Sequence, residues 1–470
     1  RCHVELAKKR IAERPLLFES FFSEEMIRDV LTRGGVVFRK RVYPPWITLW
    51  AFLGQVLSGD GACQQAVHAV CAWCLERGET PPVPDTGHYC EARRRLPLEL
   101  LSTLLAEMFE RAQAEVPQNW KWLGKHLVKV VDGTTFTLPD SSANRAAYPP
   151  DGEAAPGVRY PLVRLVSIFT LPLGLVQDFR YGAYQGKGTG EISLFRQLMD
   201  AFQPDEVLLA DKYYCSYRDV CTLFQRGVHV VVKHYAARTT LKTVRRLSKT
   251  DRVVRWHCPK FAHQKMSREE FQKLPESLLV RIVTVRVAYR GFRTQKFEVL
   301  TTLLDGEVYT SDALADLYFQ RWRAELFLDD IKTAMGLDCL RCRSPQMVAK
   351  ELLVGLLAYN GIRLQMAQAA EALDVPMTEI SFTTTLRVLR QIGSEPLTHA
   401  DSCNSAARAP DPNRRSYLLA MITHPRVGHR PGRSEPRAVK KKAKPYPSLK
   451  SPRPSFQPLK QHRTQSNRSH

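Results

Sequence analysis

Apolar residues recur at helical spacing through the first quarter of the chain. In four stretches an apolar side chain returns every three or four positions, and polar or proline-rich breaks such as residues 80–87 (TPPVPDTG) separate them. The stretches are residues 15–33, 47–57, 64–78 and 96–116. The pattern predicts a helical N-terminal region over residues 1–120.

The pattern becomes β-like at Val128. Three strand-like runs come first, and the second and third are joined by Pro172-Leu173-Gly174, which is typical of a hairpin. A helix, a short apolar strand, a second helix and another apolar strand follow. The runs are residues 128–140, 163–171, 175–184, 191–202, 206–211, 216–227 and 228–235. This order predicts a mixed α/β layer over residues 121–235.

The rest of the chain divides into three parts. Residues 236–304 are β-rich and basic, with a hairpin expected around Gly291. Residues 305–400 carry two long helical patterns, 311–336 and 344–373; Asp312 is expected to cap the first, and Ser344 with Pro345 to open the second. Residues 401–470 are rich in Pro, Ser, Arg and Lys, which predicts a largely disordered basic tail.

The formal net charge of +22 indicates an anionic polymer as partner, and nucleic acid is the commonest one. Residues 424–470 hold seven Arg and six Lys against a single acid, Glu435, so they account for +12. The remaining +10 lies in the part expected to fold. A basic surface is therefore predicted outside the tail as well.

Cysteine usage and hydropathy favour a reduced, cytoplasmic protein with no membrane segment. The eleven cysteines are too sparse for a disulfide scaffold, the N-terminus is polar, and the longest apolar run, 46–57, is too short to span a bilayer. Two CxxC pairs leave zinc open as an alternative: Cys71 and Cys74, with His88 and Cys90 downstream, and Cys339 with Cys342. Structural cysteines are the favoured interpretation, since neither pair has a second pair at the usual spacing.

Four polar residues within the helical pattern 311–336 stand at spacings that place them on one face. They are Tyr318, Arg321, Glu325 and Lys332, and at about 100° per residue they fall within roughly 60° of each other. An aromatic ring, two cations and a carboxylate suit a phosphate backbone and a divalent metal. The alternative is a solvated face with ion pairs between turns. Large apolar neighbours on the other sides predict a packed helix and so favour the functional interpretation.

Two acids upstream each follow a short apolar strand, Asp132 before Gly-Thr-Thr and Asp211 after VLLA. An acid at the end of a buried strand points into the crevice beside the sheet, where ligands bind in open α/β folds. The alternative is a cap or a turn residue. Glu325 is the third acid, with Asp329 one turn later as its rival.

Three carboxylates with neither His nor Cys beside them suit Mg²⁺, which takes oxygen ligands. Two such ions can stabilise both the attacking and the leaving oxygen of a phosphodiester. The sequence thus predicts a metal site that cuts and joins nucleic acid. Trp256, in the basic β-rich segment, either stacks on an unpaired base or packs in the core.

These residues resemble the DDE transposases of bacterial insertion sequences, specifically the insertion-sequence-four group. Its Tyr-(2)-Arg-(3)-Glu-(6)-Lys signature is filled at every position, and the surroundings of the three acids (132–149, 210–217 and 331–345) agree. The likeness runs from about residue 15 to 445. One departure is Lys212, where Arg is more usual, and it keeps the charge.

The resemblance implies a ribonuclease-H-like core interrupted by a β-rich insertion before the last acid. It implies that Asp132, Asp211 and Glu325 hold two Mg²⁺ ions, with Mn²⁺ as a substitute. Tyr318, Arg321 and Lys332 would contact DNA phosphates near the cleaved end. Such enzymes move DNA by cut and paste, often through a hairpin at the element end.

The expectation is therefore a transposase that cleaves element ends and transfers the 3′-OH to target DNA. Its partner would be double-stranded DNA, both the terminal inverted repeats of the element and the target DNA. The protein would act as a homodimer on DNA, in the cytoplasm at the bacterial nucleoid. Residues 1–120 would recognise the element ends, and the tail would add sequence-independent affinity. Two alternatives stay open: a nuclease that cuts without joining, and a catalytically dead DNA-binding descendant.

Overall fold

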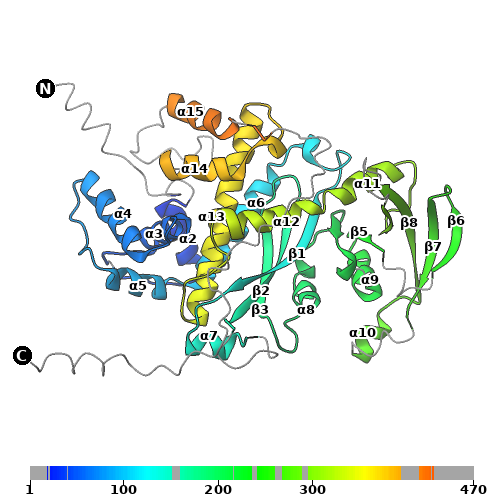
Figure 1. The fold of residues 1–470 in the computed structure, drawn as a ribbon, viewed down its shortest axis with the longest axis horizontal. Coiled ribbons are helices and arrows are strands. Elements are labelled where there is room, and N and C mark those ends of the chain that lie inside the picture. The colour runs from blue at the N-terminus through cyan, green and yellow to red at the C-terminus, as the bar shows by residue number, and fades with distance from the viewer. Residues whose placement is uncertain are drawn as a thin grey trace, which may run out of the picture.

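The computed structural model describes residues 18, 22–39, 41–150, 159–214, 216–234, 241–259, 267–287, 295–392, 412–424 and 426–427. One nine-stranded mixed sheet runs through most of the molecule in the order β3-β2-β1-β4-β5-β9-β8-β7-β6 (Figure 1). The strands are β1 Val128–Thr137, β2 Leu162–Thr170, β3 Val176–Ala183, β4 Val207–Ala210, β5 His229–Lys233, β6 Leu241–Arg246, β7 Asp251–His257, β8 Ser277–Val287 and β9 Gln295–Thr301.

The first five strands form the mixed part of this sheet. β1, β2 and β3 pair antiparallel, and the β2–β3 hairpin turns at Gly174, whose positive φ of 69° suits glycine. β4 and β5 then add parallel to β1. Parallel neighbours need a crossover, and the helices α8 Glu191–Arg196 and α9 Tyr217–Gln225 supply the two crossovers. The α/β layer and the hairpin predicted from the sequence are thus observed.

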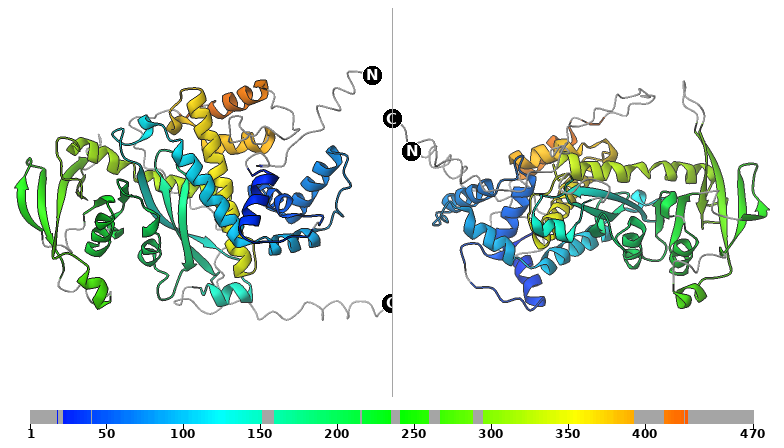
Figure 2. Two further views of the ribbon diagram at one scale, coloured as in Figure 1. Left: turned by 180° about the vertical axis from the view of Figure 1, so that it is seen from behind. Right: turned by 60° about the horizontal axis from the view of Figure 1, so that its bottom comes forward.

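Helices cover both faces of this layer, as the right-hand view of Figure 2 shows. On one face α8 and α9 pack on Val131, Ala210 and alternate residues of the neighbouring strands. On the other face Val130 and Leu209 pack toward α11 Ser311–Phe319. Farther along β1 on that face, Phe136 joins the core beneath α12 Trp322–Asp329 and α13 Pro345–Ala372. The strands are apolar on both sides because both faces are buried.

The N-terminal residues form five helices within the described part of the chain. They are α2 Glu24–Arg33, α3 Pro45–Leu57, α4 Cys63–Glu76, α5 Thr86–Arg95 and α6 Leu98–Ala114. α3 and α6 pack against α13, the long and mostly buried helix at the centre of the largest core cluster. α13 begins as expected, with Ser344 at its N-cap and Pro345 in the first turn. The N-terminal helices therefore rest on the element that also supports α12.

The strands β6 to β9 extend the sheet beyond β5 through the antiparallel pair β5–β9. β8 and β9 pair as the expected hairpin, although the turn around Gly291 lies outside the described residues. A short helix, α10 Arg268–Gln272, stands between β7 and β8. Because β9 leads into α11, the β-rich segment borders the helix that precedes Arg321.

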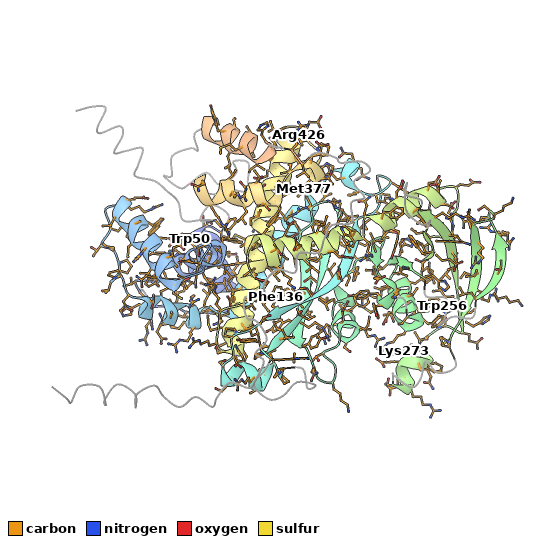
Figure 3. All side chains as sticks on the ribbon, in the orientation of Figure 1. Trp50, Phe136, Trp256, Lys273, Met377 and Arg426 are labelled. Carbon is orange, nitrogen blue, oxygen red and sulfur yellow. The ribbon has the colours of Figure 1, made fainter. Side chains whose placement is uncertain are left out.

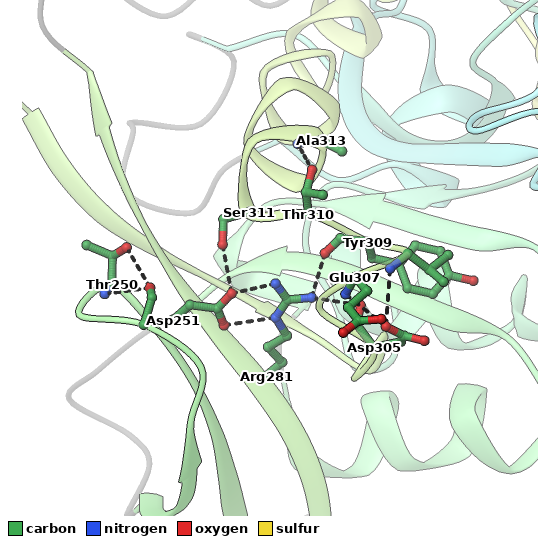
Figure 4. Close-up of polar contacts among 11 residues, drawn as sticks. Thr250, Asp251, Arg281, Asp305, Glu307, Tyr309, Thr310, Ser311 and Ala313 are labelled. Atoms are coloured by element: carbon green, nitrogen blue, oxygen red, sulfur yellow. Dashed lines mark hydrogen bonds and ion pairs between the residues drawn. The ribbon is translucent and has the colours of Figure 1, made fainter.

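A buried ion pair ties this segment to α11 (Figure 4). Arg281 on β8 donates to both carboxylate oxygens of Asp251 on β7, with Nε 2.8 Å from Oδ1. Asp251 Oδ2 also accepts a hydrogen bond from Ser311 Oγ at 2.7 Å, at the first residue of α11. Arg281 Nη1 donates to the carbonyl oxygens of Tyr309 at 2.6 Å and Asp305 at 3.1 Å. The pair therefore holds both β7 and the start of α11.

The helical pattern 311–336 is interrupted rather than continuous. α11 ends at Phe319, α12 starts at Trp322, and the last turn is a π-helical segment, η6 Asp330–Ala334. Between them Gln320 N bonds to Leu317 O and Arg321 N to Tyr318 O, both three residues back, which tightens the turn. The cap also differs from the expectation: Thr310, not Asp312, accepts the hydrogen bond from Ala313 N.

The C-terminal segment contains regular structure that the composition did not predict. α14 Phe382–Ile392 and α15 Pro412–Thr423 pack against α13, and Leu418 and Ile422 of α15 are fully buried. The expectation of a tail without regular structure from residue 401 is therefore wrong for residues 412–423. The basic residues from 428 onward lie outside the described part of the chain.

Candidate active site

Asp132 and Asp211 lie side by side on one face of the sheet. The parallel pairing of β1 with β4 matches Val130 to Leu209, so the same register two residues on sets Asp132 opposite Asp211. Side chains alternate along a strand, and both acids therefore share the face of Val130 and Leu209, toward α11 and α12. Asp132 does not end its strand as expected, since β1 continues to Thr137 through its pairing with β2. The strand that ends beside Asp132 is its parallel neighbour β4, whose last residue is Ala210.

α12 and η6 follow β1 along this face in the same direction. Glu325 on α12 interacts electrostatically with Asp132. Lys332 on η6 donates to Thr134 Oγ1 at 3.2 Å, and Leu340 N bonds to the carbonyl oxygen of Thr137. The helix thus brings its carboxylate to the acids on the strands. The structure places all three predicted acids on the same side of the sheet.

The surroundings of Asp132 disfavour its charge. Burial raises the pKa of Asp132 from 3.8 to about 6, although a hydrogen bond from the backbone N of Gly133 opposes the rise. Nearby negative charge on Glu191 and Glu325 raises this pKa further, and Arg321 lowers it. A divalent cation at this place would relieve the repulsion between the carboxylates.

Glu191 is a fourth acid at this place that the sequence pattern did not reveal. It is the first residue of α8, and the Tyr214 hydroxyl donates to its Oε1 at 2.6 Å. Neither its spacing nor its neighbours resemble a motif, because its approach to Asp132 depends on how α8 packs against β2 and β3. Only the tertiary structure identifies it.

Glu325 is paired with Arg321, one turn away. Arg321 Nη2 lies 3.0 Å from Glu325 Oε1, and the two side chains are 20% and 38% exposed. Asp329, the rival acid, is exposed and accepts a hydrogen bond from Thr333 Oγ1 at 2.6 Å. The structure therefore brings Glu325 rather than Asp329 to Asp132.

The remaining residues of the predicted stripe separate. Tyr318 is 7% exposed and packs on Phe297 of β9, with ring centroids 5.3 Å apart. Burial lowers the pKa of Lys332, while Asp338 and Asp329 raise it. Because the helix is broken at Arg321 and widened at η6, the four residues do not form the single straight stripe that was expected.

The expected packing of the other helix sides is only partly observed. Phe327 and Leu328 are buried, but Phe319, Trp322 and Leu326 are 44%, 57% and 52% exposed. These three stand at helical spacing and form an apolar surface stripe on α11 and α12. The prediction that this helix is packed on all its apolar sides is wrong for this stripe.

Trp256 lies in the core. It is 1% exposed and meets Tyr217 of α9 edge to face, with ring centroids 5.1 Å apart (Figure 3). A ring enclosed in this way has no free face for a base. The packing alternative therefore describes Trp256 in this fold.

Within the described ranges, no three His, Cys, Asp or Glu side chains already stand as a group that could hold a metal ion. This holds for both CxxC pairs, whose described cysteines are free thiols, and for the three acids, of which Glu325 is turned toward Arg321. The carboxylates of the acids are still ligands that suit a hard divalent cation. They lie where burial and neighbouring negative charge disfavour the ionised form of Asp132, and a cation would relieve this. Among the described helices, none is long and apolar enough to cross a lipid bilayer.

The chain is similar in sequence to known proteins. A family model described as a transposase DDE domain matches residues 123–360. The transposase InsG of insertion sequence element IS4 from Escherichia coli (strain K12) is 27% identical over 363 residues, covering 75% of this chain and 77% of that protein. Among solved structures, a piggyBac transposase synaptic complex with hairpin DNA matches 79% of this chain and 78% of that chain, at a TM-score of 0.41 and 10% identity. At that TM-score the structural likeness carries no argument.

Proposed function

Since the chain belongs to the family of transposases that carry a DDE domain, we propose that it moves a DNA element by cut and paste. It would cleave double-stranded DNA at the element's terminal inverted repeats and transfer the 3′-OH ends to target DNA at the bacterial nucleoid. The observation that carries this proposal is the convergence of Asp132, Asp211 and Glu325 on one face of the sheet. Arg321 pairs with Glu325, and Lys332 bonds to Thr134, two residues after Asp132 on β1.

We infer that β1 to β5 with α8 and α9 form a ribonuclease-H-like core. The mixed five-strand order and the position of two acids on its central neighbours β1 and β4 support this. The β-rich strands β6 to β9 would be the insertion that precedes the third acid. The helices of residues 1–120 would read the element ends, and two copies of the chain would act together on DNA.

Asp132, Asp211 and Glu325 would hold two Mg²⁺ ions, which Mn²⁺ could replace. When bound, these cations supply electrostatic stabilisation to the attacking and leaving oxygens of the phosphodiester. Glu325 would exchange its present partner Arg321 for the metal. The freed guanidinium could then hold a phosphate through two hydrogen bonds in its planar fork. Asp132 is partly buried, and this burial raises its pKa and so disfavours its charge in the absence of a cation.

We expect Arg321→Ala and Lys332→Ala each to weaken binding of a pre-cleaved element end by about ten- to a hundredfold. A charge-assisted hydrogen bond to a phosphate contributes on the order of 1.5–3 kcal/mol, and each 1.4 kcal/mol is a factor of ten. Tyr318→Phe should be milder, because its ring packs on Phe297. The measurement is a binding titration with nicked and uncut duplexes. Arg226→Ala, which removes an exposed cation paired with Asp200, is the control. If all variants lost DNA affinity equally, Arg321 and Lys332 would have no specific role in binding a phosphate.

Trp322 is an exposed aromatic residue on the helix that carries Glu325, and we propose that it stacks on an unpaired base. Its ring is 57% exposed and it directly follows Arg321 in the chain. Stacking on a base is worth about 1–3 kcal/mol, so Trp322→Ala should slow the cleavage of a duplex end by about ten- to a hundredfold. An end with one mismatched base pair should be affected less, because less unpairing is needed.

The matched control for Trp322 is Tyr417→Ala, which removes a 74% exposed ring from α15. Cleavage of perfect and mismatched ends is compared by single-turnover kinetics. If Trp322→Ala slowed both substrates equally, or left both unchanged, the stacking role would be wrong.

Removing residues 424–470 should lower DNA affinity without loss of specificity. The segment carries a charge of +12. A plot of log K against log salt concentration has a negative slope, and its steepness decreases by about 0.9 for every phosphate that the protein no longer neutralises. The contribution should therefore be large at low salt and shrink as salt rises. Full-length and truncated protein are titrated with inverted-repeat and random DNA across a salt series. A full-length variant with Lys440, Lys441, Lys442 and Lys444 changed to Gln is the control. It lowers the charge of the segment without shortening the chain, and so separates the effect of charge from the effect of length.

Truncation that abolished discrimination while random DNA still bound would make the tail a recognition element. In that case the assignment of end recognition to residues 1–120 would be wrong.

The function as a whole is tested with a plasmid that carries the inverted repeats flanking the gene. A transposase releases the segment between the repeats and joins it to a second DNA molecule in Mg²⁺. Cleavage without joined products would identify a nuclease instead. Binding of the repeats without cleavage would identify a catalytically dead DNA-binding protein.

A further inference from the structure

Glu191 lies against the backbone of β1 at the residue that follows Asp132. A Cβ atom built on Gly133 would come within 2.9 Å of Glu191 Cδ and 3.0 Å of its Cγ. Real side chains do not approach that closely, so only glycine leaves room for this carboxyl group. The glutamate thus stands at Gly133 from the side of α8, and its charge acts on Asp132, the preceding residue.

A tyrosine in the turn after β4 and Asp211 holds the carboxyl group. Tyr214 donates from its hydroxyl to Glu191 Oε1 at 2.6 Å, and its own N bonds to the carbonyl oxygen of Asp211. Its ring is 2% exposed and fixed edge to face against Phe195 of α8. Glu191 is thereby positioned both by the residue after Asp132 and by the turn after Asp211.

Within the described part of the chain, Glu191 has no cationic partner, and its Oε2 makes no hydrogen bond. A partly buried carboxylate placed only for stability would usually be paired with a cation. Arg321, a cation whose charge acts on Asp132, is paired with Glu325 instead. One oxygen of Glu191 is thus fixed by Tyr214, and the other is left available at the acid site.

We propose that Glu191 is a fourth carboxylate ligand of the metal site, acting with Asp132 and Asp211, and that Tyr214 positions it. The proposal rests on the proposed function, because it adds a residue to the same site. A further carboxylate oxygen is a ligand of the kind that Mg²⁺ and Mn²⁺ prefer. Gly133 is then required for access of the ligand rather than for a turn.

A structural role for Glu191 makes a different prediction. Glu191→Gln keeps the shape and an oxygen that accepts from Tyr214, but it removes the charge. Tyr214→Phe keeps the charge and loses the hydrogen bond. If Glu191 only anchored Tyr214, the Gln variant would bind metal like the wild type.

The experiment counts Mn²⁺ bound to the full-length protein by electron paramagnetic resonance, with no activity involved. Wild type is compared with Glu191→Gln, Tyr214→Phe and Asp132→Asn, and Glu269→Gln, an exposed glutamate on α10, is the matched control. We expect Glu191→Gln to weaken Mn²⁺ binding by at least about tenfold and Tyr214→Phe to weaken it less. Asp132→Asn should weaken it at least as much as Glu191→Gln, and Glu269→Gln should leave it unchanged. Melting temperatures without metal check that each variant is folded.

The outcomes separate the two proposals. Wild-type binding in Glu191→Gln, together with loss in Asp132→Asn, would overturn the role of Glu191 and leave the metal site standing. Binding that is unchanged in Asp132→Asn, or absent from the wild type, would overturn the metal site itself and the role of Glu191 with it.

Discussion

Replacing Asp132, Asp211 or Glu325 singly with alanine is expected to abolish DNA cleavage while leaving binding of the element ends largely intact. Each acid would hold a cation that contributes several kcal/mol to the transition state, so its loss should slow cleavage by about a thousandfold or more. All three side chains are partly exposed, Glu325 to 38%, so their loss should not disrupt a packed core. The measurements are single-turnover cleavage in Mg²⁺ and gel-shift binding of the same duplex.

Asp329→Ala is the matched control for Glu325→Ala. Asp329 is exposed and bonded to Thr333 within its own helix, so its loss should change cleavage little. Chelator-sensitive cleavage that survived in Glu325→Ala but disappeared in Asp329→Ala would show that the other acid is the third ligand. Loss of end binding in all three alanine variants would indicate unfolding rather than loss of a ligand.

The stability of Asp132→Asn gives an independent check on the same site. The folded protein raises the pKa of Asp132 from 3.8 to about 6, so ionisation of Asp132 opposes folding in the absence of metal. The asparagine variant should therefore be more stable than wild type above pH about 6. The gain should shrink as pH falls through 6 and disappear below the unfolded value of 3.8. Melting temperatures in a chelating buffer measure it.

The second large effect is expected from Arg281→Met, which should destabilise the protein by about 3–5 kcal/mol and reduce cleavage. Asp251 and Arg281 are 5% and 1% exposed, and removing one partner leaves the other charge buried and unpaired. The same change frees the start of α11, because Arg281 donates to the carbonyl oxygen of Tyr309. Denaturant unfolding and cleavage kinetics measure the two effects.

Arg252→Ala is the control, one residue along the same strand from Asp251. Arg252 pairs with Glu298 while the two side chains are 31% and 25% exposed, so its loss should cost no more than about 1 kcal/mol. The double variant Asp251→Leu with Arg281→Met should regain much of the stability, because an apolar pair leaves no buried charge. If that variant regained stability but not cleavage, the pair would position α11. If Arg281→Met matched Arg252→Ala in both measurements, the pair would have no special role.

The sequence allowed a good part of the architecture to be predicted. The strand and helix order of residues 121–235 and the β2–β3 hairpin followed from apolar runs and from Pro172-Leu173-Gly174, which are local signals. The family could be recognised because the signature around Tyr318, Arg321, Glu325 and Lys332 is contiguous in the chain. The roles of these residues stay predictions that the variants above test.

Several expectations failed where one element's environment depends on another. Trp322 looked like a packing residue, but it is 57% exposed. For Trp256 the sequence left stacking and packing both open, and only the contact with α9 decides for packing. The helix 311–336 has a continuous apolar pattern, yet it breaks at Arg321. The spacing of apolar residues describes one helix by itself. It does not show which face of that helix contacts another element.

By itself, the sequence determined which residues could carry the chemistry, because residue type and local spacing are written in the chain. It determined the segments that form strands and helices, and the basic character of both the folded part and the tail. The tertiary structure decided which side chains meet. The β1–β4 register sets Asp132 beside Asp211, α8 brings Glu191 against Gly133, and the Asp251–Arg281 pair fixes the start of α11. These contacts join residues far apart in sequence, and their geometry follows from packing and burial across elements, which no local pattern contains.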